Sequence, residues 1–219
     1  IMVYDRLEHL KQLIDSLLLD PLSSNTDLYL ISDAAYKDEH KTRIEEVRTY
    51  AYSIKGFKTV IIIADVENRG AFESYEYLKN LIFEKHENLI FFEDDNMVSP
   101  NYLAFMNNAF NKYKDNPKVA YVCGYNFPID ISKEYPYDVY FYPSVCAWGY
   151  GLWKSKILDV SKLTKEEMRK DKKTLNNIKK KSSQLYHILM SDIYSDRFLN
   201  DARIGYFLYK NDMVSVFPK

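Results

Sequence analysis

Glycine, cysteine and long apolar runs are all scarce in this sequence. Its 219 residues include 6 glycines and 2 cysteines. So few glycines exclude a glycine-rich phosphate loop as the binding device, and a nucleotide would have to be held in another way. Cys123 and Cys146 are too few for a disulfide framework, and we interpret them as small buried apolar residues. No apolar stretch approaches the roughly 20 residues that a membrane-spanning helix needs.

An excess of charge of either sign is also missing. Lys plus Arg is 30 and Asp plus Glu is 31, a formal net charge of -1. This balance excludes a protein that coats nucleic acid through charge alone. Aromatic residues are abundant instead, with 20 Tyr, 12 Phe and 2 Trp, and they can form a large core. We expect a cytoplasmic protein with one domain, 1–219, made of a first half, 1–100, and a second half, 101–219. Both ends run into apolar, strand-like residues, so we also expect a chain trimmed at both ends.

The first half alternates short apolar runs with segments of helical periodicity. The runs predict strands at 1–3, 28–31, 59–63 and 89–92, and the periodic segments predict helices at 7–18, 42–53 and 71–83. We expect the β-branched run at 59–63 to be a buried strand. Strands that alternate with helices favour parallel pairing, so we predict an α/β fold with a mixed, mainly parallel sheet flanked by helices.

The second half is less regular. Ser99 and Pro100 predict a helix start, and an apolar stripe follows over 102–113. Residues 119–123 predict a strand, the aromatic segment 135–142 an antiparallel strand or a loop, and the lysine-rich segment 162–183 a solvated helix pair.

Polar side chains follow each predicted strand of the first half. Ligands of α/β sheets collect at the carboxyl ends of the strands. The group with the most distinctive chemistry is Glu93-Asp94-Asp95, three adjacent carboxylates that repel one another unless a cation or hydrogen-bond donors compensate. Mg²⁺ or Mn²⁺ prefers such oxygen ligands. A solvated acidic turn is the alternative.

The segment 88–103, Asn-Leu-Ile-Phe-Phe-Glu-Asp-Asp-Asn-Met-Val-Ser-Pro-Asn-Tyr-Leu, resembles the metal-binding segment of GT-A glycosyltransferases. Within that class it is most similar to the N-acetylglucosaminyltransferase I family and related bacterial sugar transferases. These carry a Glu-Asp-Asp form of the acidic DXD motif before a similar Pro-led helix. The resemblance implies a GT-A, Rossmann-like fold and a hexosyl- or N-acetylhexosaminyltransferase that uses a UDP-sugar and Mn²⁺ or Mg²⁺. The acceptor would be a saccharide or a lipid-linked sugar, as in polysaccharide biosynthesis.

The same resemblance implies roles for residues at the strand ends. Asp95 would be the direct metal ligand, and Glu93 and Asp94 would lie near the ribose and the donor sugar. Asp33 would accept a hydrogen bond from uracil; a turn or helix cap is its alternative. The remaining nucleotide contacts would be Tyr4, Arg6, Asn68 and Arg69. The alternatives are a surface ion pair of Arg6 with Asp5 or Glu8, and a plain turn at 68–70.

Both tryptophans lie in one segment together with two glycines. This segment includes Trp148, Gly149, Tyr150, Gly151 and Trp153. Aromatic faces stack on sugar rings, and the segment resembles the Trp-Gly loop that shapes the donor and acceptor pockets of sugar transferases. A tightly packed core turn is the alternative.

Transfer to a hydroxyl needs a general base. In inverting members of the resembling family this base is an Asp or Glu at a helix start after the Trp-Gly loop. The candidates are Asp192, Asp196 and Asp201, of which Asp201 matches best and Asp196 second. A helix cap or an ion pair with Arg203 is the alternative for Asp201.

Eight basic and three acidic side chains occupy Lys165–Lys181, a local excess of five. A solvated helix is the common interpretation of such a segment, and peripheral contact with an anionic membrane is the more specific hypothesis.

The four scattered histidines have no metal-binding spacing. Two rival functions stay open: an α/β nucleotidyltransferase, and a binding module for nucleotide-sugars or glycans without turnover.

Overall fold

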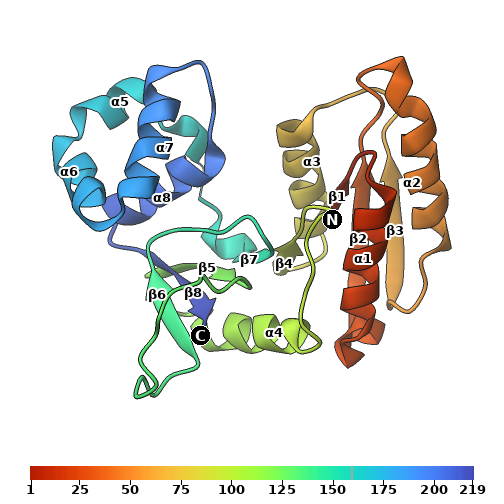
Figure 1. Ribbon diagram of the computed structural model, residues 1–219, viewed down its shortest axis with the longest axis horizontal. Coiled ribbons are helices and arrows are strands. Elements are labelled where there is room, and N and C mark those ends of the chain that lie inside the picture. Colours follow the sequence, from red (N-terminus) through yellow and green to blue (C-terminus); the bar gives the residue numbers. More distant parts are fainter. Residues whose placement is uncertain (159) are drawn as a thin grey trace. The chain divides into compact units, whose positions relative to one another are not determined.

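The computed structural model describes residues 1–158 and 160–219. The chain divides into two compact units, Ile1–Asn108 and Ala109–Lys219, each of which is described by itself. Figure 1 shows the order of their elements along the chain.

The first unit has alternating strands and helices. These are β1 (Met2–Val3), α1 (Leu7–Leu18), β2 (Asp27–Ser32), α2 (Lys41–Ser53), β3 (Thr59–Ala64), α3 (Ala71–Phe83) and β4 (Asn88–Phe91), with 3₁₀ helices at Pro21–Asn25 and Asp38–His40. β1, β2 and β3 form a parallel sheet in that order, with Ile31 opposite Met2 and Ile63 opposite Ile31. Beyond β1, Met2 forms a parallel bridge with Glu93, which directly follows β4 and Phe92.

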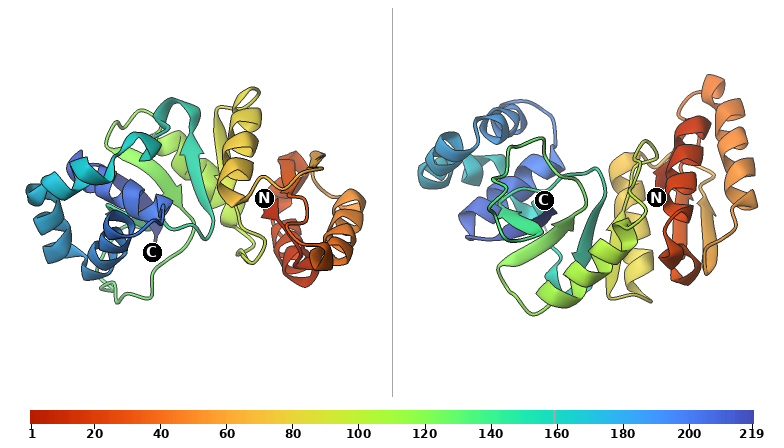
Figure 2. Two further views of the ribbon diagram at one scale, coloured as in Figure 1. Left: turned by 90° about the horizontal axis from the view of Figure 1, so that it is seen from above. Right: turned by 60° about the horizontal axis from the view of Figure 1, so that its bottom comes forward.

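Helices cover both faces of this sheet. Figure 2 shows α1 and α2 on one face and α3 on the other. The leucine stripe of α1 is buried at Leu10, Leu13 and Leu17, as its spacing predicts. β2 is buried along nearly its whole length. The prediction of a strand at 59–63 is confirmed, but the prediction that this strand is buried is wrong. Among the described strands, β3 pairs only with β2, and its residues are partly exposed.

The second unit contains a mixed sheet and a group of helices. Its strands are β5 (Val119–Cys123), β6 (Val139–Tyr142), β7 (Tyr150–Trp153) and β8 (Val214–Pro218). β5 runs parallel to β8 and antiparallel to β7, and β6 runs antiparallel to β8. Its helices are α5 (Lys165–Lys170), α6 (Lys172–Lys181), α7 (Ser183–Tyr194) and α8 (Asn200–Lys210), with 3₁₀ helices at Lys154–Lys156 and Val160–Lys162. The predicted α/β class, with a mixed, mainly parallel arrangement flanked by helices, is confirmed.

The helices α5 to α8 pack on one another and appear as one group in Figure 1. Met168 of α5, Leu175 and Ile178 of α6, Leu189 of α7 and Tyr206 of α8 are buried together. The predicted helix pair at 162–183 is confirmed as α5 and α6, but it is not solvated on all sides, because its few apolar residues form this core.

α4 (Tyr102–Tyr113) begins later in the chain than the Ser99-Pro100 start signal predicts.

Candidate functional site

A pocket of about 480 Å³ opens at the carboxyl ends of the strands in the first unit. This volume lies in the range of small-molecule sites. Its lining includes all the predicted nucleotide-binding residues except Arg69, namely Tyr4, Arg6, Asp33, Asn68, Glu93 and Asp94. The parallel sheet accounts for their convergence, because β1, β2 and β3 end at one edge and the bridge at Met2 brings Glu93 beside β1.

Arg6 faces the acidic turn across this edge. Its guanidinium donates to Asp94 and, at 2.9 Å, to Oδ2 of Asp95. The alternative partners do not hold it, since Asp5 pairs with Arg43 and Glu8 with Lys11. A planar guanidinium shared by two carboxylates is a strong arrangement. It places a positive group where the sequence predicts a divalent ion.

The two carboxylates differ in environment. Asp94 is only 3% exposed, whereas Asp95 keeps an exposed surface. Burial raises the pKa of Asp94, against the opposing effect of Arg6. Within residues 1–158 and 160–219, no three Asp, Glu, His or Cys side chains are grouped so as to hold a metal ion. Asp94 and Asp95 offer the carboxylate oxygens that Mg²⁺ prefers, and in this structure Arg6 donates to both of them.

The carboxylate of Asp33 accepts hydrogen bonds from the loop that follows β3. Its Oδ1 accepts from the backbone N–H groups of Ala34 (2.8 Å) and Arg69 (2.9 Å). Its Oδ2 accepts from Asn68 Nδ2 (3.0 Å) and from the N–H of Gly70 (2.9 Å). This geometry corresponds to the turn-organising alternative for Asp33, and its uracil contact stays a prediction. The same bonds explain how Asn68 is turned toward the pocket.

Arg48 and Arg69 brace the same edge of the sheet. Arg48 of α2 donates to the carbonyl oxygens of Ser32, the last residue of β2, and of Asp33 and Asp65, which directly follow β2 and β3. Arg69 pairs with Asp65 at 2.9 Å and stacks over the ring of Tyr77, and it does not line the pocket.

Three polar residues of the pocket, Tyr36, His40 and Ser74, have no signal in the sequence. The hydroxyl of Tyr4 accepts from the N–H of Tyr36 (2.9 Å) and lies 2.7 Å from Nδ1 of His40. This network ties the segment after β1 to the segment after β2. The third residue is Ser74, which is 2% exposed. Each depends on a contact distant in sequence, which residue spacing alone does not reveal.

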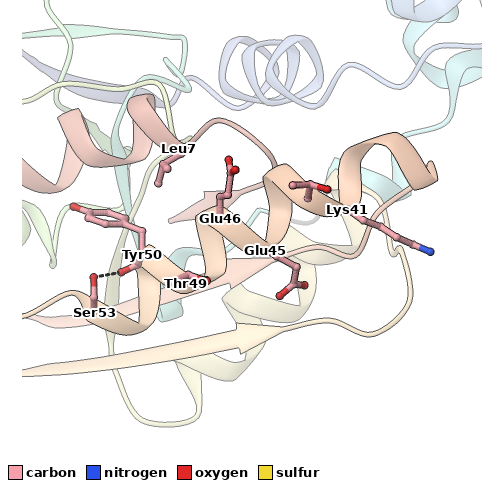
Figure 3. Close-up of a pocket in the computed structure, with 8 residues that line it drawn as sticks. Leu7, Lys41, Glu45, Glu46, Thr49, Tyr50 and Ser53 are labelled. Atoms are coloured by element: carbon pink, nitrogen blue, oxygen red, sulfur yellow. Dashed lines mark hydrogen bonds between the residues drawn. The ribbon is translucent and has the colours of Figure 1, made fainter.

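A second groove, of about 720 Å³, runs along α2 near Leu7 (Figure 3). Glu45 and Glu46 line it with Lys41 as the single basic residue among the lining side chains. The predicted nucleotide-binding residues line the pocket at the strand ends and not this groove, so that pocket is the better candidate for a nucleotide.

In the second unit, Asp201 lies near the end of β5. It occupies the first turn of α8, where the helix dipole favours a carboxylate. Its charge acts on the thiols of Cys123 and Cys146, which are buried and not joined by a disulfide. Burial raises the pKa of Asp201, although the residue keeps an exposed surface. A carboxylate with a raised pKa at an accessible position has the properties of a general base.

The Trp-Gly segment leads from Cys146 into β7. Trp148 is 55% exposed and meets Tyr125 edge to face, with ring centroids 4.8 Å apart. Trp153 is 3% exposed, and its indole donates to the carbonyl of Phe110, which favours the packed-core alternative for this residue. Gly149 has a φ of 80°, a conformation that favours glycine. Trp148 is thus the aromatic face of this segment that a sugar could reach; Tyr150 and Gly151 are buried.

Asp192 and Arg203 form a buried ion pair. Arg203 Nε donates to both carboxylate oxygens of Asp192, at 3.1 and 3.0 Å, and Nη2 donates at 2.9 Å. Asp192 also accepts from the N–H of Leu199, directly before α8. Arg203 is therefore held by Asp192 and not by Asp201. Asp196 is exposed in the segment between α7 and α8.

Fold and pockets together define an α/β protein with a ligand pocket at the carboxyl edge of a parallel sheet. Among the described residues, no helix combines the length and the apolar character needed to cross a bilayer.

No family model matches the sequence, and the comparison with curated proteins finds no match. The chain is similar in fold to the mannosyltransferase PcManGT from Pyrobaculum calidifontis, solved in complex with GDP-Man and Mn²⁺. The TM-score is 0.47 at 12% identity, over 70% of this chain and 43% of that one. It is also similar to TarS of S. aureus, with a TM-score of 0.44 at 12% identity, over 68% of this chain and 27% of that one. The chain therefore spans less than half the length of either protein, and likeness at this level identifies no substrate.

Proposed function

We propose that the chain is a metal-dependent glycosyltransferase that moves a sugar from a UDP-sugar to a hydroxyl of a saccharide or glycolipid. The observation that carries this proposal is the pocket of about 480 Å³ at the strand ends, where Arg6 and Asp94 meet Asp33 and Asn68. The resemblance of 88–103 to the DXD segment of GT-A glycosyltransferases supplies the substrate class. The 1–219 chain would then act as one GT-A-like catalytic domain.

In the first unit, the donor's base and ribose would occupy the pocket, and its diphosphate would lie toward Arg6 and the acidic turn. Asp95 would bind Mn²⁺ or Mg²⁺, with the neighbouring Asp94 as second carboxylate. The ion's chemistry there is neutralisation of the charge that develops on the leaving nucleotide. Arg6 would pair with a phosphate through its planar fork once the carboxylates have another cation.

In the second unit, Asp201 would accept the proton of the acceptor hydroxyl. The hydroxyl oxygen forms a bond to the anomeric carbon as the bond from that carbon to the diphosphate breaks. This direct displacement inverts the anomeric configuration. The raised pKa of Asp201 supports the assignment, since general bases work best when their pKa approaches the operating pH. Asp196 is the second choice, and Trp148 would contact a sugar ring.

A lipid-linked acceptor would bring the enzyme to a membrane surface. Lys172, Lys173, Lys180 and Lys181 of α6 are exposed, while Leu175 and Ile178 face the helical core. A helix with lysines on its outer face is attracted to anionic lipid. We propose this face as the peripheral membrane contact.

The direct test is release of UDP from a panel of UDP-sugars with Mn²⁺, with and without saccharide acceptors. Asp95→Ala is expected to abolish metal-dependent release, while Asp38→Ala, an exposed carboxylate outside the pocket, leaves it unchanged. Asp201→Asn is expected to lower transfer about 100-fold or more with unchanged UDP affinity, whereas Asp196→Asn retains it.

Intact turnover in Asp95→Ala contradicts the metal assignment, and intact transfer in Asp201→Asn moves the base elsewhere. Binding of UDP without turnover of any donor would favour the non-catalytic module.

A further inference from the structure

The carboxylate of Asp192, near the end of α7, joins the two ends of the first turn of α8. Its Oδ2 accepts from the backbone N–H of Leu199, directly before α8, at 2.6 Å. Both of its oxygens accept from the guanidinium of Arg203 inside the helix. The backbone N–H of Arg203 in turn donates to the carbonyl oxygen of Leu199 at 3.1 Å, as in the first hydrogen bond of a helix. These bonds close a ring around residues 199–203, and Asp201 lies at the middle of that segment.

The ring is buried and has further support. Asp192 is 0% exposed and Arg203 is 4% exposed. The guanidinium also donates through Nη1 to the carbonyl oxygen of Leu163 at 2.8 Å, and it lies over the ring of Phe198, 4.1 Å from its centroid. Charge-assisted hydrogen bonds shielded from water are strong and directional. The first turn of α8 is therefore held against α7 in one orientation.

Asp201 and Arg203 serve different sides of α8. Residues two positions apart in a helix do not face each other. Arg203 is directed at Asp192 of α7, whereas the charge of Asp201 acts on the thiols of Cys123, which ends β5, and Cys146, before β7. A rotation of this turn would therefore change both the place of the Asp201 carboxylate and its burial.

The stability of the second unit alone does not explain why an ion pair occupies this position. Apolar residues of similar volume often stabilise a buried site as well as an ion pair does. A planar guanidinium on a carboxylate adds directional bonds, which apolar packing lacks. The pair is thus suited to fix an orientation.

We propose that Asp192 is a positioning residue for the general base Asp201: through Leu199 and Arg203 it fixes the orientation of the turn that carries the base. This inference rests on the proposed function, in which Asp201 accepts the proton of the acceptor hydroxyl. Asp192, itself a candidate base in the sequence, acts here only through α8.

The kinetics of sugar transfer test this role. Asp192→Asn keeps the shape of the side chain and one acceptor oxygen but loses the charge. It is expected to lower kcat roughly tenfold or more, because a catalytic group displaced by 1 Å can cost about 100-fold. UDP affinity with Mn²⁺ should not change, since the candidate nucleotide pocket belongs to the first unit. Arg203→Lys keeps both charges but loses the planar fork, and it should lower kcat in the same way if Asp192→Asn fails to fold.

Asp171→Asn is the matched control. The carboxylate of Asp171 accepts from the hydroxyl of Tyr206 at 2.9 Å, further along the same helix. This variant should loosen α8 outside its first turn and keep the kcat of the wild type.

A double-mutant cycle in urea at pH 7 tests the link between Asp192 and Asp201 without turnover. Burial raises the pKa of Asp201, so Asp201→Asn should raise the urea midpoint of the wild type. The same change should raise the midpoint of Asp192→Asn by less, because a loosened turn exposes Asp201 to water. In the Asp171→Asn background its effect should equal that in the wild type.

Unchanged kcat in both Asp192→Asn and Arg203→Lys overturns the inference and leaves the proposed function standing. An equal loss of kcat in Asp171→Asn also overturns it, because the effect would then follow the stability of α8 as a whole. Equal effects of Asp201→Asn in the wild-type and Asp192→Asn backgrounds overturn it as well. If the wild type transfers no sugar, or if Asp201→Asn retains transfer, the proposed function or its base fails, and the inference fails with it.

Discussion

Replacing Asp192 by alanine should destabilise the second unit strongly. The carboxylate is fully buried and receives three N–H···O contacts from Arg203, and it also accepts from the N–H of Leu199. Without it, Arg203 stays buried and keeps the carbonyl of Leu163 as an acceptor. Removing one partner of a buried ion pair typically costs about 3 to 5 kcal/mol, because the other charge stays buried.

Urea unfolding followed by tryptophan fluorescence measures this effect in the right place, because both tryptophans belong to the second unit. Asp196→Ala is the matched control: the residue is exposed four positions away, and its loss should stay within about 0.5 kcal/mol. A loss below about 1 kcal/mol in Asp192→Ala would refute the view that this pair holds the start of α8.

Three further predictions concern charge and packing. Burial raises the pKa of Asp201 in the folded protein, so folding favours the protonated carboxyl group. This stabilisation is fully present below the ordinary carboxyl pKa and is lost as pH rises through the pKa of Asp201 in the folded protein. Asp201→Asn should therefore unfold at a higher urea concentration than the wild type at pH 7 and show no advantage at acidic pH. Arg6→Ala should bind Mn²⁺ alone more tightly than the wild type in calorimetry, because the arginine no longer competes for the two carboxylates of the acidic turn; Arg43→Ala should not. Gly205→Ala should cost about 1 to 3 kcal/mol in urea unfolding, because its Cβ would lie 2.8 Å from Cδ1 of Leu185. Equal stability of Gly205→Ala and the wild type would contradict the close packing of α7 on α8.

Local patterns in the sequence predict most of the first unit. The leucine spacing of 7–18 and the apolar runs at 28–31 and 89–92 define their elements because each pattern matches the burial that the element needs. Whether a strand is central or at an edge depends on sheet order, which no local pattern contains. The β-branched run at 59–63 therefore predicts a strand correctly and its burial wrongly.

The candidate site shows the same division. Its acidic turn is visible in the sequence because three carboxylates follow an apolar run. The partner of that turn is not, since Arg6 lies 88 residues from Asp94. Nor does the sequence reveal that Asp33 is occupied by its own loop, because this depends on the conformation of 68–70. In the second unit, the lysines of 162–183 conceal a sparse apolar stripe that becomes a core only when α7 and α8 pack on it.

The central claim is that the pocket of the first unit binds a nucleoside diphosphate together with a divalent ion. Calorimetry of UDP with the wild-type protein and with Asp95→Ala, each with Mn²⁺ and with a chelator, tests it most directly. The account predicts binding that needs Mn²⁺ in the wild type and is lost in Asp95→Ala. Equal UDP affinity in all four experiments, or no binding of UDP to the wild type with Mn²⁺, would contradict it.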